Sequence, residues 1–222
     1  MSVQFFVEVA SGDHTEWSDS ICRTIEEAAR SRGTGIALRT PAYISGKILE
    51  GKAVIALARH EGSDVLAFAG FCYIETWGGK KYVANSGLVV APAYRHSGLA
   101  REIKKRAFGL SREKYPQARL FGITTNHAVM KINTDLGYVP VPFSELTRDD
   151  EFWNGCRSCP NYDILNRTGR SMCLCTAMLF DPEKTPRTQR VEDGKDIAEP
   201  QRVEDGKDTA EPQRVEEVLR AG

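Results

Sequence analysis

A short loop between two strongly patterned segments constrains this chain most. The apolar run 82–90 precedes the loop, and the amphipathic stretch 99–113 follows it. We therefore expect a strand, a tight turn and a helix in succession. The residues Arg95, Gly98 and Ala100 form an Arg-x-x-Gly-x-Ala pattern where the helix begins. Unpaired backbone N–H groups and the positive end of the helix dipole make such a position an anion site. Gly98 would let the backbone approach a phosphate closely.

The spacing of apolar residues predicts alternating strands and helices along the rest of residues 1–182. Asp19 or Ser20 and Thr40 are expected to cap the first two helices, which would end at Gly33 and Gly51. Two further helices are expected over 99–113 and from Ala128 to Gly137. Strands are expected over 3–9, 53–58, 65–77, 82–90, 120–124 and 172–180. This order implies an α/β (α+β) fold, a mixed sheet with helices on both faces.

Length and composition fit one soluble domain with an appendage. The chain has 222 residues, of which 41% are apolar and 27% are charged. No run approaches the ~20 apolar residues of a membrane helix, and the N-terminus is too acidic for a secretory signal. We therefore expect a cytoplasmic protein with reduced cysteines and no membrane partner. Because the formal net charge is zero, no nucleic-acid partner is expected.

The last forty residues are unlike the rest of the chain. The segment 189–200 recurs almost unchanged as 201–212, and a third copy begins at Gln213. Each 12-residue unit has one or two aliphatic residues, one Gly and one Pro, so it buries too little surface to offset chain entropy. We expect a domain over 1–182 and a disordered tail over 183–222. A partner-binding arm is the alternative for this tail.

The loop resembles the pyrophosphate loop of the GNAT N-acetyltransferases, whose pattern is Arg/Gln-x-x-Gly-x-Gly/Ala. Asn126 and the Leu-Gly-Tyr triplet 136–138 follow at the spacing of that family's next motif. The resemblance covers residues 33–180 and implies a mostly antiparallel GNAT-like sheet that binds acetyl-CoA. In that family the strand before the loop splays from its neighbour near a bulge. Gly87, inside an otherwise regular strand, fits such a bulge.

The resemblance also implies roles for individual residues. Backbone groups of the strand would hydrogen-bond the pantetheine arm, at Leu88, Val89 and Val90. The pyrophosphate would be held by the loop residues Arg95, His96, Gly98, Leu99 and Ala100. Asn126 would face the cofactor arm. The simplest alternative for the Arg-x-x-Gly pattern is a surface turn with a glycine at a helix end.

Direct attack of an amine on a thioester needs a base, an oxyanion donor and an acid. Glu75 is the first candidate for the base, because burial in an apolar strand would strengthen its carboxylate as a base; a solvent-facing Glu is the alternative. His127, beside Asn126 at a helix start, is the second candidate. Many family members carry a Tyr acid where this chain has Asn133. Tyr138, Tyr94 or water would have to replace it.

The acceptor side is expected between the first two helices, in the polar segment 31–40. Arg32 and Arg39 could each grip a carboxylate in bidentate fashion, which suits an anionic amino acid such as glutamate. The alternative is two solvated arginines near helix ends. The chain is similar to small GNAT proteins assigned to arginine biosynthesis as N-acetylglutamate synthases, and the transferred group could be acetyl or succinyl.

Four late cysteines form two close pairs, at positions 156 and 159 and at positions 173 and 175. The residues Cys156, Cys159, Cys173 and Cys175 suit a structural tetrahedral zinc site, within a cysteine-rich loop over 151–175. A redox-active C-x-x-C pair, or two cysteines on one face of a strand, are the alternatives. Cys22 and Cys72 are expected in the core.

These patterns leave more than one function open. The first is an enzyme that transfers an acyl group from CoA to a small amine, either as a monomer or as a homodimer. The second is a non-catalytic module that binds acyl-CoA, which Asn133 in place of the usual acid keeps open. The third is a zinc-stabilised interaction domain whose loop pattern is accidental.

Overall fold

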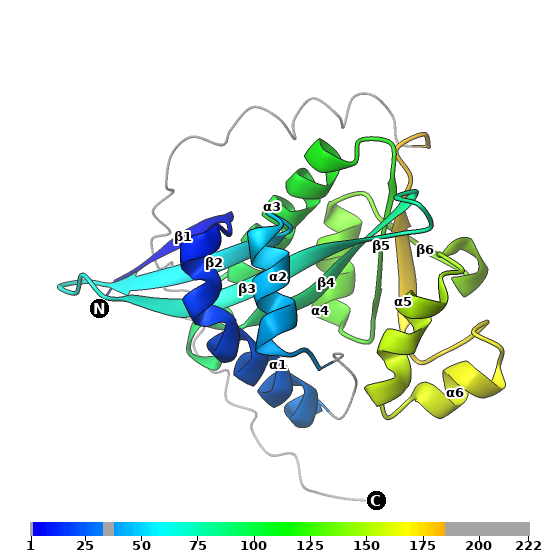
Figure 1. Ribbon diagram of the computed structural model, residues 1–222, viewed down its shortest axis with the longest axis horizontal. Coiled ribbons are helices and arrows are strands. Elements are labelled where there is room, and N and C mark those ends of the chain that lie inside the picture. Colours follow the sequence, from blue (N-terminus) through cyan, green and yellow to red (C-terminus); the bar gives the residue numbers. More distant parts are fainter. Residues whose placement is uncertain (1, 33–37, 185–222) are drawn as a thin grey trace, which may run out of the picture.

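The computed structural model describes residues 2–32 and 38–184 (Figure 1). Its centre is a seven-stranded sheet in the order β1-β2-β3-β4-β5-β7-β6. The strands are β1 (Val3–Val9), β2 (Ala53–His60), β3 (Leu66–Trp77), β4 (Tyr82–Val90), β5 (Arg119–Thr124), β6 (Val139–Val141) and β7 (Thr176–Phe180). Strands β4 and β5 pair in parallel and all other neighbours pair antiparallel. The expected mixed, mostly antiparallel sheet is confirmed.

Helices cover both faces of the sheet. They are α1 (Ser18–Arg32), α2 (Pro41–Leu49), α3 (Leu99–Lys114) and α4 (His127–Asp135). Alternate residues of β2 separate the two layers: Val54 packs in the core beneath α3, whereas Ile55 packs in the core beneath α1 and α2. Figure 1 shows α1 and α2 crossing in front of the sheet while α3 lies behind it.

Two helix ends follow the residues that the sequence predicted, whereas the expected cap at Asp19 or Ser20 is wrong, because both residues lie inside α1. The Thr40 side chain accepts a hydrogen bond from the Tyr43 backbone N–H at 3.2 Å, and Pro41 follows as the first helical residue. Gly137 has a φ of +85° directly after α4, which is a conformation that closes helices. Ser18, one residue before the expected caps, begins α1.

The segment 142–175, between β6 and β7, differs from the sequence prediction. It forms two 3-10 turns and two short α-helices rather than a loop: η3 (Phe143–Glu145), α5 (Asp150–Asn154), η4 (Gly155–Ser158) and α6 (Tyr162–Arg167). The expected strand 172–180 begins only at Thr176. These short elements share a third core that includes Trp153 and Leu165. Figure 1 shows the segment packed beyond β5 and β7, away from α1.

Strand β4 bulges and then separates from β5. Phe71 lies opposite Val89 and Tyr73 opposite Ser86, so Cys72 faces two residues of β4. One of these two residues, Gly87, has a φ of +66°. Pairing between β4 and β5 covers only three residue pairs and ends where Ala84 meets Phe121. The expected bulge is confirmed, and the backbone edge of β4 beyond Ala84 faces an opening rather than β5.

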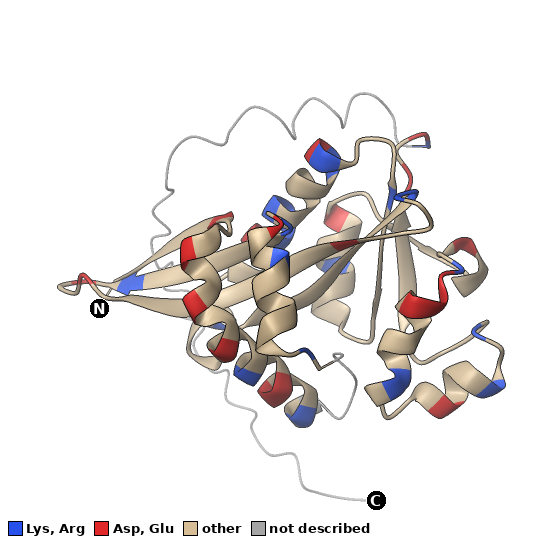
Figure 2. Cartoon of the chain, in the orientation of Figure 1, with Lys and Arg blue, Asp and Glu red and all other residues tan. Residues whose placement is uncertain are grey.

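Some expectations concern residues outside the described part of the chain. The tail expected over 183–222 lies there from residue 185 onward, as do residues 33–37 of the segment 31–40 expected at the acceptor side. Within residues 2–32 and 38–184, no helix has the length and apolar content to cross a bilayer. Figure 2 shows basic and acidic residues interspersed along the helices in this view.

Candidate functional site

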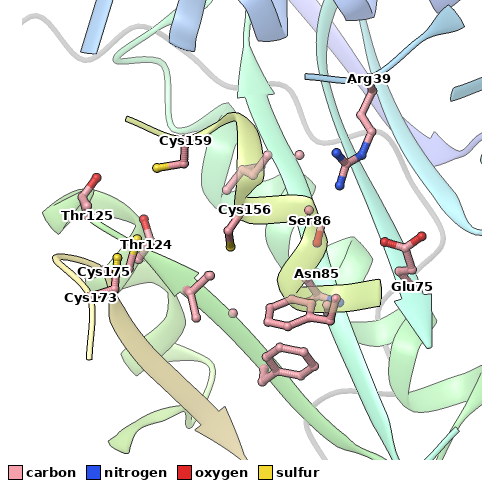
Figure 3. Close-up of a pocket in the computed structure, with 18 of the residues that line it drawn as sticks. Arg39, Glu75, Asn85, Ser86, Thr124, Thr125, Cys156, Cys159, Cys173 and Cys175 are labelled. Atoms are coloured by element: carbon pink, nitrogen blue, oxygen red, sulfur yellow. The ribbon is translucent and has the colours of Figure 1, made fainter. Parts of the chain in front are cut away.

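A cavity of about 580 Å³ lies where β4 and β5 separate. Its walls come from three parts of the chain: the N-terminal end of α2, the separated strands, and the segment 142–175. Figure 3 shows Arg39 and Glu75 on one side of this cavity and the four late cysteines on the other, with Asn85 and Ser86 of β4 between them. The opening between the strands thus continues into a chamber lined by charged, aromatic and thiol groups.

The loop after β4 forms an exposed turn that leads directly into α3. Gly98 adopts a φ of +82° at the N-cap, and a Cβ placed there would meet no atom within 4 Å. His96 also has a positive φ, and Arg95 donates from Nε to the Val90 carbonyl oxygen at 3.3 Å. Of the expected pyrophosphate residues, Leu99 is buried beneath α3 and the other four lie at the surface or half-buried. The first turn of a 16-residue helix therefore faces open space.

The expected pantetheine strand has one side chain in the cavity. Leu88 lines the cavity, whereas the side chain of Val89 packs in the core beneath α1 and α2. Val90 packs partly against the core beneath α3. Asn126 lines the cavity from the start of α4, where its Oδ1 accepts from the backbone N–H groups of Ala128 and Val129. Its side chain is therefore occupied as a helix cap.

Arg39 reaches the cavity between two tyrosines. Its Nε donates to the Tyr73 hydroxyl at 2.9 Å, and its guanidinium lies 5.0 Å from the ring centre of Tyr43. On its far side, Arg39 Nη2 lies 3.8 Å from the Cβ position of Gly155, in the segment 142–175. The guanidinium therefore spans the gap between α2 and that segment. Arg32, the other residue expected to bind the acceptor, is the last residue of α1, and its side chain lies outside the part of the chain that the structure describes.

Glu75 lines the cavity, but its carboxylate is not held in the apolar setting that the sequence suggested. Its Oε1 accepts from the Tyr43 hydroxyl and lies 2.8 Å from Lys47 Nζ, with both charged side chains only 14% exposed. The setting of Glu75 therefore differs from the expected one, because α2 brings Tyr43 and Lys47 to the same carboxylate oxygen, Oε1.

Burial also changes the chemistry of the tyrosines around Glu75. It raises the pKa of Tyr43, and the neighbouring Tyr73 and the hydrogen bond to Glu75 act in the same direction. The pKa of Tyr73 is likewise raised by burial, although Arg39 opposes this. Both phenols therefore stay protonated; Tyr43 donates to Glu75, and Tyr73 accepts from Arg39.

The structure does not bring two of the expected catalytic residues into the cavity. His127 lies exposed at the start of α4 and is not among the residues that line the cavity. Tyr138 is 1% exposed in the core between α3 and β7, and its hydroxyl donates to Asn85 Oδ1 at 3.1 Å. Burial raises the pKa of Tyr138 well above its usual value. Tyr138 therefore fixes the Asn85 side chain, which does line the cavity, and lies too deep to meet a leaving thiolate.

Asn133, at the position of the family's acid, is also buried. Its Nδ2 donates to the Met178 sulfur at 3.6 Å, and its Oδ1 has no partner among the described residues. An amide cannot supply a proton at a useful pKa. Tyr94 lies away from this region, because its hydroxyl is 3.0 Å from His60 Nε2 at the other end of the sheet.

The four late cysteines all line one side of the cavity and are all free thiols. Burial raises the pKa of Cys156 to about 11, and Cys159 and Cys173 add to the shift. Burial and the other three cysteines raise the pKa of Cys175 to about 12. Cys173 and Cys175 precede β7, so the alternative of two cysteines on one strand face is wrong. In the described part of the chain, no group of three or more His, Cys, Asp or Glu side chains is placed to hold a metal ion, so the expected zinc site is not found there.

Sequence reasoning missed several residues of this site. Tyr43, Lys47 and Tyr73 complete the network around Arg39 and Glu75, and Asn161 lines the cavity beside the cysteines. A signal existed for Tyr43 and Lys47, because they are four residues apart and share one face of α2. No pattern in the sequence marked Asn161.

Comparison with known proteins places the fold but not the activity. No protein-family model and no curated protein matches this chain. Among solved structures, it is similar to Rv2747 from Mycobacterium tuberculosis in complex with CoA, with 15% identity, a TM-score of 0.56, and coverage of 79% of this chain and 98% of the other. The structure of yncA from Salmonella typhimurium with its cofactor acetyl-CoA is similar at 15% identity and a TM-score of 0.52, covering 82% of this chain and 96% of that one.

A third similar structure is the N-acetylglutamate synthase from Neisseria gonorrhoeae, complexed with coenzyme A and N-acetyl-glutamate. It has 15% identity and a TM-score of 0.53 over 80% of this chain, which spans only 35% of the length of that enzyme. This chain, with its seven-stranded, mostly antiparallel sheet flanked by helices, matches the fold of these solved structures. The chain therefore has the GNAT fold.

Proposed function

We propose that this protein is an N-acyltransferase that uses acyl-CoA and acylates the amine of a small amino acid. The observation that carries this proposal is the free backbone edge of β4, which runs from Ala84 to the exposed N-terminus of α3. A chain of backbone N–H and C=O groups followed by a helix N-terminus suits a ligand that has amides at one end and a diphosphate at the other. Pantetheine diphosphate is such a ligand.

The described residues fit an acyl-CoA molecule in this place. Gly98 leaves open space at the helix N-terminus, where a Cβ would otherwise project. Arg95 and His96 are exposed beside it and supply positive charge for phosphate oxygens. The thioester supplies the activated acyl group, and a backbone N–H at the β4 bulge, beside Gly87, is placed to stabilise the developing oxyanion.

Arg39 and Glu75 give the cavity opposite charges on one wall, which suits an amino acid. We assign the acceptor carboxylate to the guanidinium of Arg39 and the acceptor amine to the carboxylate of Glu75. Tyr43 and Lys47 hold Oε1 of Glu75, so Oε2 is the oxygen assigned to receive the proton of the attacking amine. This arrangement supports direct attack without a covalent enzyme intermediate. Glutamate remains the first acceptor to test, with acetyl or succinyl as the acyl group.

The test is turnover of acetyl-CoA and succinyl-CoA with a panel of amino acids, followed as thiol release and confirmed by the mass of the acylated product. The Gly98→Glu variant places a carboxylate against the diphosphate, and we expect it to weaken CoA binding at least about 100-fold. Gly79→Glu is the matched control, because Gly79 has a φ of +66° and open space but lies in the β3–β4 turn, at the opposite end of β4 from the loop. Equal CoA affinities of the two variants would contradict the proposal.

A second candidate is a non-catalytic acyl-CoA-binding module. It is favoured by the two positions where an acid was expected, because Asn133 carries an amide and Tyr138 is buried. Tight CoA binding that is lost in Gly98→Glu, with no acyl transfer to any amine in the panel, would establish this second function instead of the first.

A further inference from the structure

Cys156 and Cys159 form a pair of thiols that the proposed acyl transfer does not use. Cys156 lies inside the 3-10 turn η4, and Cys159 is the residue that directly follows this turn. Both thiols are free and half-buried, and both residues line the cavity. A small molecule in solution can therefore reach them from the cavity. Whether they can bond to each other depends on how the backbone of η4 places them.

The backbone of η4 holds the two cysteines at the spacing of a disulfide. The Cys159 N–H donates to the Cys156 carbonyl oxygen at 2.9 Å, which is the hydrogen bond between residues three apart that defines a 3-10 turn. In this geometry two such residues stack on one side of the turn, with Cα atoms about 6 Å apart. Disulfides most often join Cα atoms about 5.5–6 Å apart. No backbone movement is therefore needed for a Cys156–Cys159 bond.

The side chains have room to turn toward each other. Figure 3 shows the two thiols on this turn pointing in different directions. Cys156 packs against the third core, whereas Cys159 Sγ accepts from the backbone N–H of Asn161 at 3.5 Å. The two residues between them, Arg157 and Ser158, are exposed. Rotation about the two Cα–Cβ bonds is thus the movement that brings the sulfur atoms together.

We propose that Cys156 and Cys159 are a reversible thiol–disulfide site that is oxidised by exchange with a small disulfide such as oxidised glutathione. Cys159 sulfur attacks first, because Cys156 packs against the core, and forms a mixed disulfide that releases one small thiol. Cys156 sulfur then attacks this mixed disulfide and releases the second small thiol. Two S–H bonds of the protein are replaced by one S–S bond, and the two electrons and two protons pass to the small disulfide.

The second step is favoured because it occurs within the turn. Burial raises the pKa of Cys156 to about 11, which slows its attack on a disulfide in solution. Attack on a mixed disulfide at Cys159 gains from a neighbour that the turn holds in place, so its effective concentration far exceeds that of a free thiol. The mixed disulfide should therefore be short-lived and the internal disulfide should be the product.

The bond would form on the wall of the cavity that faces Arg39. Gly155 directly precedes Cys156, and its Cβ position lies 3.8 Å from Arg39 Nη2. An internal disulfide would close η4 into a covalent ring at this edge of the cavity. Its formation requires only the two thiols and the small disulfide, so this inference does not depend on the proposed acyl transfer.

The test uses the full, unsubstituted chain, first reduced and then exposed to oxidised glutathione. After the remaining thiols are blocked, trypsin cleaves behind Arg157, and only a disulfide keeps the Cys156 and Cys159 peptides joined. We expect this internal disulfide to exceed mixed glutathione disulfides at least about tenfold, and dithiothreitol to restore both thiols. Stable mixed disulfides as the main product, or a bond that involves Cys173 or Cys175 instead, would overturn the proposal.

Two serine variants test the order of attack. Cys156→Ser should accumulate glutathione on Cys159, because no second thiol is present to displace it. Cys173→Ser is the matched control, because Cys173 lines the same cavity but lies outside η4, and it should still form the Cys156–Cys159 bond. Absence of glutathione from Cys159 in the first variant, or loss of the bond in the second, would contradict the proposal. If a variant fails to fold, the unsubstituted chain still decides, and the Gly98→Glu test of acyl-CoA binding is independent of either result.

Discussion

A single methyl group at Gly87 tests the geometry that opens β4 away from β5. Gly87 has a φ of +66°, and a Cβ there would lie 2.6 Å from Cε1 and 2.9 Å from Cδ1 of Tyr73. The backbone conformation alone costs an alanine about 1–2 kcal/mol. The overlap adds about 1–3 kcal/mol, because Tyr73 is 2% exposed and cannot swing away. Gly87→Ala should therefore lower the free energy of unfolding by about 2–5 kcal/mol.

Gly79→Ala is the control that isolates the overlap. Gly79 also has a φ of +66°, yet a Cβ there would meet no atom within 4 Å. Both variants carry the same backbone cost and the same loss of unfolded-state entropy, so these contributions cancel in the difference. Only the contact with the Tyr73 ring remains, which we expect to make Gly87→Ala less stable than Gly79→Ala by about 1–3 kcal/mol.

Thermal and denaturant unfolding of both variants measures this difference. For a domain of this size, 1 kcal/mol changes Tm by about 2–4 °C, so the two variants should differ by roughly 2–12 °C. The CoA affinity should fall in Gly87→Ala and stay unchanged in Gly79→Ala, because only the first disturbs the β4 edge. Equal unfolding free energies of the two variants would refute the idea that the bulge is packed against Tyr73.

Two further substitutions test the core and the acceptor side. Burial lowers the pKa of Lys104 to about 8 from 10.5, so the folded state binds fewer protons than the unfolded state between these values and stability rises with pH there. Lys104→Met should therefore stabilise the protein by roughly 3 kcal/mol at pH 7. Denaturant unfolding should show this gain shrinking from pH 8 to pH 10, and a constant gain would contradict the reasoning. Arg39→Lys should raise KM for an amino-acid acceptor about tenfold, because the planar guanidinium that binds a carboxylate through two N–H groups is lost. KM for the corresponding amine without the carboxylate should stay unchanged. Equal effects on both substrates would exclude Arg39 as the carboxylate ligand.

Most of the sheet and its covering helices could be predicted because their signals are local. β4 was expected at its observed bounds, and α3 was expected within one residue of its observed end. Apolar residues at helical spacing, such as Ile103 and Ala107, do face the core. Gly87 could also be interpreted in advance, because a glycine inside a strand is typical of a bulge.

The candidate site was harder to predict because its contacts join distant residues. Lys47 and Glu75 lie 28 positions apart, and only the packing of α2 on β3 brings them within 2.8 Å. Tyr138 follows a helix-closing glycine in a motif that resembles one with a catalytic role, but its ring turns into the core beneath α3. Motif spacing identifies the loop that ends at Gly98, whereas the direction of a side chain depends on the whole sheet.

The segment 142–175 shows why the acceptor is the least predictable part of this protein. A helix of five or six residues has too few apolar positions for a periodic signal, so α5 and α6 could not be recognised in advance. Yet this segment supplies one wall of the cavity, and its Gly155 lies against Arg39. In our proposal, the donor side is formed by long, regular elements, and the acceptor side by short turns that depend on a small core. A change in the segment would therefore alter which amine is accepted while leaving the acyl-CoA opening between β4 and β5 intact.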